Sequence, residues 1–77
     1  MTMARYLESV TIYDHPSDHP EHYVVRFFHV TADGLVADPH AYLFHTLEEA
    51  RQIPAARGMF RFERAEADDP VIVESWM

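Results

Sequence analysis

Residues 13–30 read YDHPSDHPEHYVVRFFHV, a stretch that joins a loop to the clearest strand of the chain. The first part of it holds three of the six histidines and two of the five prolines of the protein. Because proline pushes the residue before it towards extended backbone, His15 and His19 are expected to be extended and the loop to be stiff. The second part, Tyr23–Val30, has apolar residues on both faces. Such a strand is predicted to lie inside a sheet with both of its faces covered.

Outward from this stretch, period-two alternation and turn residues predict further strands on both sides. The dipeptide Asp33-Gly34 indicates a tight turn after Tyr23–Val30. A hairpin continues over Leu35–Ala37 until the dipeptide at 38–39, Asp-Pro, breaks it. The predicted strands are Tyr6–Tyr13, Tyr23–Val30, His40–His45, Met59–Arg64 and Val71–Trp76.

One short helix is predicted between the third and the fourth strand. Thr46 and Glu49 have the spacing of a capping box, in which each side chain accepts a hydrogen bond from the backbone N–H of the other residue. The helix is expected to stop at Pro54, after about Ile53, because proline lacks a backbone donor and clashes with the preceding turn. Its buried stripe is predicted to consist of Leu47, Ala50 and Ile53.

These elements predict a single α+β domain over residues 1–77, with a small antiparallel sheet of about five strands and the order strand-strand-strand-helix-strand-strand. Phe60 and Phe62 alternate with arginine and are expected to belong to the core. A helix this short cannot cover one face of five strands, and the other face also carries large apolar side chains. We therefore expect a second copy of the chain to cover them, which gives a homodimer.

The composition limits the classes of function. The formal net charge is −7, from 13 acidic residues against 6 arginines, and there is no lysine. An acidic surface repels phosphate groups, which argues against a nucleic-acid partner. The absence of lysine excludes Schiff-base chemistry and a P-loop. The absence of cysteine excludes disulfides and thiolate zinc sites.

The sequence shows no segment that would place the chain in a membrane. Its first residues are not followed by the apolar region of a signal peptide. No apolar run approaches the roughly 18 residues of a membrane helix. We therefore expect a cytoplasmic protein without a membrane partner.

Both ends of the chain carry a pattern that resembles other proteins. The pattern consists of Tyr13-Asp14-His15-Pro16, Asp18, Pro20, Val24-Val25-Arg26, Asp69-Pro70-Val71-Ile72-Val73-Glu74 and Trp76. It is similar to that of a set of short uncharacterised bacterial and phage-associated proteins, for which no activity is known. The resemblance is weaker between Ala32 and Arg57. It implies that the loop and the last strand belong together and that the chain is complete, and it assigns no catalytic residue.

The loop histidines suggest a metal site as an alternative. His15, His19 and His22 are spaced four and three residues apart, so they would share one face if the loop were helical. Imidazole nitrogens, with a carboxylate or water completing the shell, are typical ligands of zinc or nickel. The two prolines argue against a regular helix, and a solvated turn explains the same residues. The alternative function is therefore a metal-binding or hydrolytic protein that uses these three histidines.

Three further patterns bear on function. Six histidines suggest a pH switch, although they are scattered along the chain. The run of arginine and phenylalanine over residues 57–64 is partly similar to RNA-recognition strands, but the acidic total favours a core role for its phenylalanines. Glu74 and Arg26 lie on apolar strands and are predicted to form a structural ion pair, because an unpaired buried charge is costly.

The residue types best suited to anchor a protein partner are aromatic rings and histidines in or near the loop. We predict a small non-enzymatic protein-interaction module, without a cofactor, that binds another protein through the loop from Tyr13 to Tyr23 or through an exposed face of the sheet. No catalytic residue is assigned. The predicted binding residues are Tyr13, His15, His22, Tyr23 and Trp76.

Overall fold

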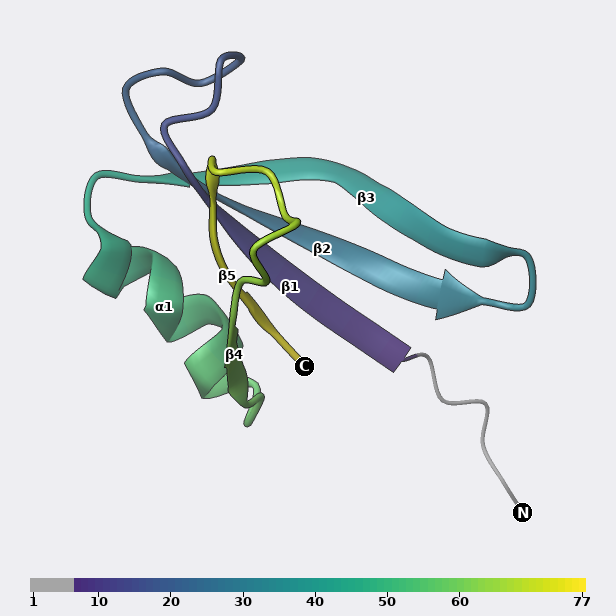
Figure 1. Cartoon of the computed structure of the whole chain (residues 1–77). Coiled ribbons are helices and arrows are strands. Elements are labelled where there is room, and N and C mark those ends of the chain that lie inside the picture. Colours follow the sequence, from purple (N-terminus) through teal and green to yellow (C-terminus); the bar gives the residue numbers. More distant parts are fainter. Residues whose placement is uncertain (1–6) are drawn as a thin grey trace.

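The computed structural model describes residues 7–77 and contains a five-stranded antiparallel sheet with one helix (Figure 1). This is the small α+β fold that the sequence predicts. The predicted beginning of the first strand, Tyr6, lies outside the described residues. In chain order the elements are β1 (Leu7–Asp14), β2 (Tyr23–Thr31), β3 (Gly34–Phe44), α1 (Leu47–Ala56), β4 (Arg61–Glu63) and β5 (Ile72–Trp76).

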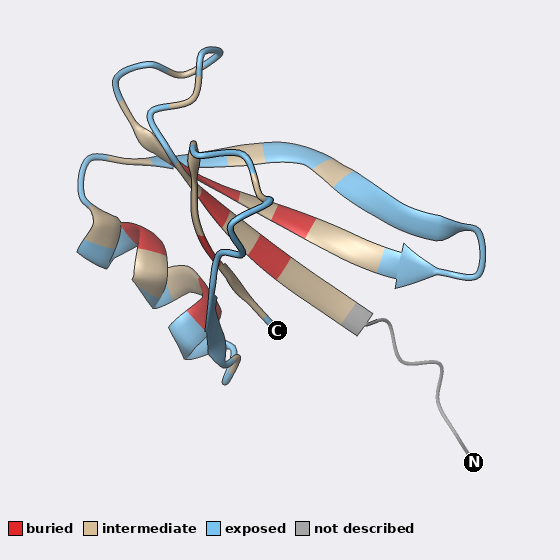
Figure 2. Ribbon diagram, viewed as in Figure 1, coloured by how far each residue is buried: buried red, intermediate tan, exposed pale blue. Residues whose placement is uncertain are grey.

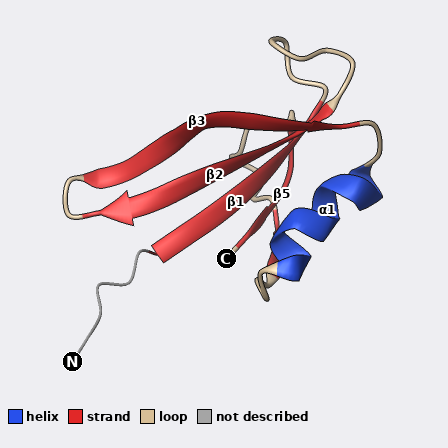
Figure 3. Ribbon diagram, turned by 180° about the vertical axis from the view of Figure 1, so that it is seen from behind, coloured by secondary structure: helices blue, strands red, loops and turns tan. Residues whose placement is uncertain are grey.

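The strand order of the sheet is β3-β2-β1-β5-β4, so β1 is the central strand. Helix α1 packs on one face, which we call the helix face (Figure 3). Val10 and Ile12 of β1 point to this face, where they pack in one cluster with Ala50 of α1. Successive side chains of a strand alternate between faces. Thr11 and its partner Arg26 therefore point to the opposite face, which we call the open face.

The hydrophobic core lies between α1 and the middle of the sheet (Figure 2). Leu47 and Ile53 pack against it, which confirms the predicted stripe of the helix. The later part of β2 is not covered on the open face within the described chain, where Val30 is 44% exposed. The predicted cover of this face by a second copy stays a prediction. The fully buried members of the core cluster are Val10, Ile12, Val25, Phe27 and Ala50.

Strand β3 runs through the predicted break at residues 38 and 39. Asp38, Pro39 and His40 lie opposite the single residue Phe27 of β2, so β3 carries a bulge. Edge strands and bulges are the two places where a sheet tolerates proline, and Pro39 is in both. The bulge adds two residues to β3. Because this number is even, the alternation of β3 side chains between the helix face and the open face matches that of β2 on both sides of the bulge.

Helix α1 begins with the predicted capping box. The Thr46 hydroxyl accepts a hydrogen bond from the Glu49 N–H at 3.1 Å, and the Glu49 carboxylate accepts one from the Thr46 N–H at 3.3 Å. The predicted stop at Pro54 is wrong, since the helix continues to Ala56. The ring of Pro54 is fully buried, and this burial offsets the one helical hydrogen bond that proline removes. Among the described residues there is no helix with the length and apolar character needed to cross a membrane.

The segment around β4 differs most from its prediction. The strand has three residues instead of six. Phe60 is 74% exposed and Phe62 is 50% exposed, so the prediction that both belong to the core is wrong. Phe62 pairs with Ser75, which pairs with Thr11, and this register puts Phe62 on the open face. From this segment it is Met59 that packs against the core.

Glu74 of β5 ties the helix to the sheet through a buried carboxylate. Its side chain is 1% exposed. It accepts two hydrogen bonds from Arg51 of α1, from Nε at 2.9 Å and from Nη2 at 2.8 Å. The indole Nε1 of Trp76 donates a third at 2.8 Å. A second guanidinium, of Arg61 on β4, lies 3.5 Å from the carboxylate.

The charge on Glu74 is stabilised by these partners. Burial by itself raises the pKa of Glu74, but the hydrogen bonds from Arg51 and Trp76 outweigh it and the pKa is lowered. The same hydrogen bonding raises the pKa of Arg51. The predicted ion pair of Glu74 with Arg26 is wrong. Glu74 lies beside Ile12 on the helix face, whereas Arg26 is on the open face, where its guanidinium is 3.6 Å from Asp18.

Candidate binding surfaces

The loop between β1 and β2 is held by its own backbone. The N–H of His15 donates to the carbonyl of His22 at 3.0 Å, which closes the loop at its base. Inside it, the N–H of His19 donates to the Pro16 carbonyl at 2.9 Å, and the N–H of His22 donates to the His19 carbonyl at 3.2 Å. His15 is not extended as predicted, because it has a φ of 50° in the left-handed region. This conformation turns the chain from β1 into the loop.

Two of the predicted binding residues are neighbours. The rings of His15 and Tyr23 meet edge to face with their centroids 4.9 Å apart. The Nδ1 atom of His15 also contacts the carboxylate of Asp14. Tyr23 is half-buried and packs against the core. Tyr23 therefore contributes to the fold, which leaves only part of its side chain for a partner.

The other three predicted binding residues lie elsewhere. Tyr13 is on the open face, and burial together with Asp18 and Asp69 raises its pKa by more than Arg26 lowers it. The ring of His22 packs on that of His45 at 5.1 Å. Trp76 pairs with Val10 of β1, away from the loop, and its indole N–H donates a hydrogen bond to Glu74. The structure thus does not bring the five residues together on one surface.

The three histidines predicted as metal ligands have different neighbours. His15 contacts Asp14, His22 contacts His45, and Nε2 of His19 is 3.9 Å from the Asp18 carboxylate. Within residues 7–77 no group of three or more His, Asp or Glu side chains is close enough together to hold a metal ion. The side chains are not arranged as the zinc or nickel site that the spacing suggested.

Replacing Tyr23 by alanine is expected to lower the melting temperature by about 10 °C, because the change removes about 2 kcal/mol of core packing. His15→Ala removes a ring contact and the contact with the Asp14 carboxylate, both at the surface, so we expect a shift of less than about 2 °C. Thermal unfolding followed by circular dichroism measures both shifts. Equal melting temperatures for the two variants would contradict the core role of Tyr23.

The open face of the sheet carries exposed apolar side chains along both edges. On the side of β3 these are Val30 (44% exposed), Leu35 (62%) and Leu43 (41%). On the side of β4 they are Phe60, Phe62 and Met77. Near the loop this face is partly covered. The Asp18 carboxylate lies 3.6 Å from the Arg26 guanidinium there, and Val24 is only 1% exposed.

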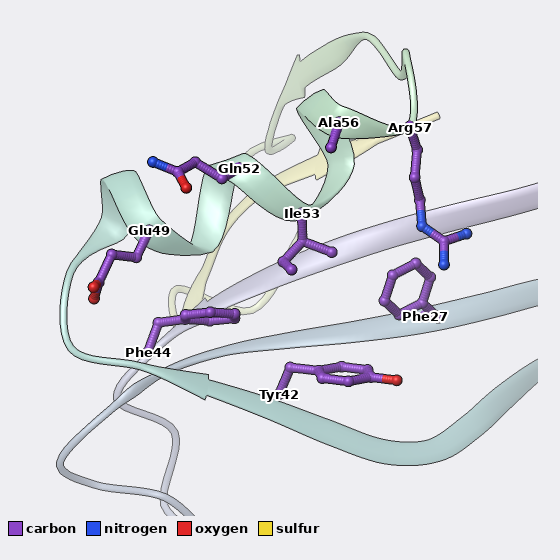
Figure 4. Close-up of a pocket in the computed structure, with 8 residues that line it drawn as sticks. All are labelled: Phe27, Tyr42, Phe44, Glu49, Gln52, Ile53, Ala56 and Arg57. Atoms are coloured by element: carbon purple, nitrogen blue, oxygen red, sulfur yellow. The ribbon is translucent and has the colours of Figure 1, made fainter.

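A second surface lies between α1 and the later part of β3, where a pocket of about 570 Å³ opens beside the helix (Figure 4). We call it the groove. Phe27, Tyr42 and Phe44 rise from the sheet, and Ile53 points down from the helix. Phe27 and Tyr42 meet edge to face at 5.7 Å. The remaining lining residues are Glu49, Gln52, Ala56 and Arg57.

The two ends of the groove carry opposite charges. Arg57 lies over the ring of Phe27, with its guanidinium carbon 4.5 Å from the ring centroid, and it donates to Glu8 at 3.0 Å. Glu49 is at the other end, at the start of α1 (Figure 4). No local sequence pattern predicts this groove, because the groove depends on which strand lies next to the helix.

Comparison of the chain with models of known protein families, with curated proteins and with solved structures found no match. The resemblance to short bacterial and phage-associated proteins therefore stays a prediction.

Proposed function

We propose that this protein is a non-enzymatic protein-interaction module that works as a homodimer, in which two copies cover each other's open faces. The observation that carries the proposal is the set of exposed apolar side chains along both edges of that face. Exposed apolar residues gathered on one face are typical of protein–protein interfaces. A domain of this length also has a marginal core of its own and gains stability from a partner chain.

Two rows of side chains cross the middle of the open face and end in residues of different size at the two edges. One row crosses the sheet through Ala41, Arg26, Thr11, Ser75 and Phe62. A neighbouring row begins with Ala37 on β3 and ends with Phe60, whose backbone pairs with that of Met77. Each row therefore has an alanine at the edge formed by β3 and a phenylalanine at the edge formed by β4.

The alanine end of each row is complementary in size to its phenylalanine end. A two-fold axis parallel to the central strand β1 places β3 of one copy against β4 of the other. Phe62 of one copy then packs on the partner's Ala41, and Phe60 packs on the partner's Ala37. Two sheets pack in this aligned manner about 10 Å apart, and large residues facing small ones fill the space between them.

Light scattering over a range of protein concentrations measures the oligomeric state. We expect a dimer for the wild type and a dissociation constant about a hundredfold higher for Phe62→Glu, which buries a charge in the interface. Val36→Glu is the matched control, because Val36 is equally exposed at 50% but lies on the helix face. It is expected to leave the dimer intact. A monomeric wild type, or equal weakening by the two variants, would overturn the proposal.

A mixing experiment tests the two-fold arrangement itself. Phe62→Lys and Ala41→Glu are each expected to be monomeric, because each places two uncompensated charges in its own dimer. A mixture of the two variants forms one wild-type contact and one Lys–Glu contact, so it is expected to restore a dimer. Failure of the mixture to dimerise would show that Phe62 does not face Ala41.

A further inference from the structure

We infer that the groove and the outer edge of β3 together form a binding site for an extended, basic segment of a partner protein, which adds to the sheet as a further strand. This inference names the partner of the interaction module proposed above and rests on that function. The site itself lies on the helix side and uses no residue of the open face.

The outer edge of β3 is a template for strand addition in two stretches, residues 34–37 before the bulge and 41–44 after it. β3 has 11 residues and is the first strand in the order of the sheet, so it pairs with β2 alone. Within residues 7–77 no backbone hydrogen bond connects β3 to a segment other than β2. The outward N–H and C=O groups of these two stretches are available to an extended peptide, whereas Pro39 in the bulge has no N–H. The opposite edge, β4, has only three residues and offers much less.

The groove is placed to receive side chains from a strand added at this edge. Tyr42 and Phe44 of β3 point to the helix face and line the groove. An added strand would lie about 5 Å from β3 and direct every second side chain to that same face. A large apolar side chain would then enter between Phe44 and Ile53. The volume of about 570 Å³ lies within the range of about 300 to 1,000 Å³ that is usual for ligand pockets.

The charge of the protein selects a basic segment. Five arginines lie in the described part of the chain, and each contacts acceptor groups of the protein itself. With a net charge of −7, the surface that remains is acidic. In the groove itself Glu49 is the acidic end, and Arg57 at the other end is paired with Glu8. A basic segment complements this surface and is steered to it at low salt. The contacts of the arginines are Arg26 with Asp18, Arg51 and Arg61 with Glu74, Arg57 with Glu8, and Arg64 with the carbonyls of Ala65 and Asp68.

The probe is a displayed library of random nine-residue peptides, selected against the wild-type chain at low salt. We expect the selected peptides to alternate, with one large apolar residue and flanking arginine or lysine, and to slow hydrogen exchange of the β3 amides when bound. N-methylation of alternate residues distinguishes strand addition from apolar adsorption. Methylation of the residues whose N–H groups face β3 is expected to weaken binding at least about tenfold, and methylation of the other alternate residues much less. An empty selection, acidic peptides, or equal effects of the two sets would overturn the inference.

Two variants of the helix test the location. Gln52→Arg places a cation and a long side chain at the rim of the groove, and we expect it to weaken peptide binding about tenfold or more. Ala55→Arg makes the same charge change on the same helix, at an exposed residue that does not line the groove. It is expected to stay within about twofold of the wild type, because only screened charge repulsion acts there. Equal effects of the two variants would overturn the inference.

Peptide binding by Phe62→Glu separates this inference from the proposed dimer. The groove of that variant is intact, so its dissociation constant for the selected peptide is expected to equal that of the wild type. A monomeric wild type that still binds the peptide at β3 would contradict the proposed dimer and support the peptide site in the groove. A dimeric wild type that selects no peptide would contradict the peptide site and support the proposed dimer.

Discussion

Replacing Arg51 by methionine is expected to lower the free energy of unfolding by about 3 kcal/mol at neutral pH. The change removes two hydrogen bonds from the Glu74 carboxylate, which is 1% exposed and cannot turn to water instead. The Arg51 side chain is 39% exposed, so the loss of stability comes from the buried Glu74 charge that loses its hydrogen bonds and not from lost burial of the arginine. A domain of this size has a total stability of about 5 to 10 kcal/mol, and the loss is therefore a large part of it. Urea denaturation followed by the fluorescence of Trp76 measures it.

The loss is expected to shrink as the pH falls. In the wild type the pKa of Glu74 lies below its ordinary value of 4.5, so its contribution is present above pH 4.5 and is lost as the pH falls through the folded-state pKa. Without Arg51, burial is expected to outweigh the remaining contacts with Trp76 and Arg61, and the pKa of Glu74 is expected to rise above its ordinary value. The variant then takes up a proton on folding and regains stability towards low pH, while the wild type does not. The difference between the two proteins is thus largest near neutral pH, and a constant difference would contradict the assigned cause.

Two further variants control for the loss of a positive charge. Arg57→Met removes an exposed pair with Glu8 and the contact of the guanidinium with the Phe27 ring, and each of these contributes less than about 1 kcal/mol. The double variant Arg51→Met with Glu74→Leu removes both charges and is expected to recover much of the loss, since no unpaired buried charge remains. If Arg51→Met were no worse than Arg57→Met, the ion pair would not hold the helix to the sheet.

Ile12→Ala is expected to cost about 3 to 4 kcal/mol of unfolding free energy. Ile12 is completely buried on the central strand and lies between Val25 of β2 and Glu74 of β5. The cavity left by the change is enclosed on both sides by strands that cannot move without breaking the ladder. The graded change Ile12→Val is expected to cost only about 1 kcal/mol.

Val36→Ala controls for the general effect of shortening an aliphatic side chain. Val36 is 50% exposed on the outer hairpin, so we expect a change of less than about 0.5 kcal/mol. The midpoint of urea denaturation at fixed protein concentration compares the three variants, because a dimer makes stability depend on concentration. A loss for Ile12→Ala below about 1 kcal/mol would contradict the position of the core.

Sequence patterns predicted the elements well where the controlling interaction is local. The capping box of Thr46 and Glu49 and the turn before Gly34 depend on residues a few positions apart, and both are confirmed. At Gly34 a φ of 121° is reached without strain because glycine has no Cβ. Pro39 and Pro54 misled the prediction because the cost of proline depends on its surroundings. One is in a bulge at a sheet edge, and the other has a buried ring near the end of a helix.

The binding surfaces could not be predicted because they depend on which elements are neighbours in space. Phe60 and Phe62 have the alternation of a core strand, and only the position of β4 at the sheet edge leaves them exposed. The partner of Glu74 is on the helix, 23 residues away in sequence, and no spacing rule links the two. The groove arises where β3 passes beside α1, and its residues come from three separate elements.

The central position of β1 has a consequence for the order of events while the chain is being synthesised. β1, β2 and β3 follow one another, so their antiparallel ribbon can form as soon as they have left the ribosome. The other side of β1 waits for β5, which is made only after the helix and β4. During that interval the nascent chain exposes a second unpaired edge and a helix without its carboxylate anchor, the state in which contact with other nascent chains is most harmful. The net charge of −7 is expected to oppose contact between such chains by charge repulsion until β5 closes the sheet.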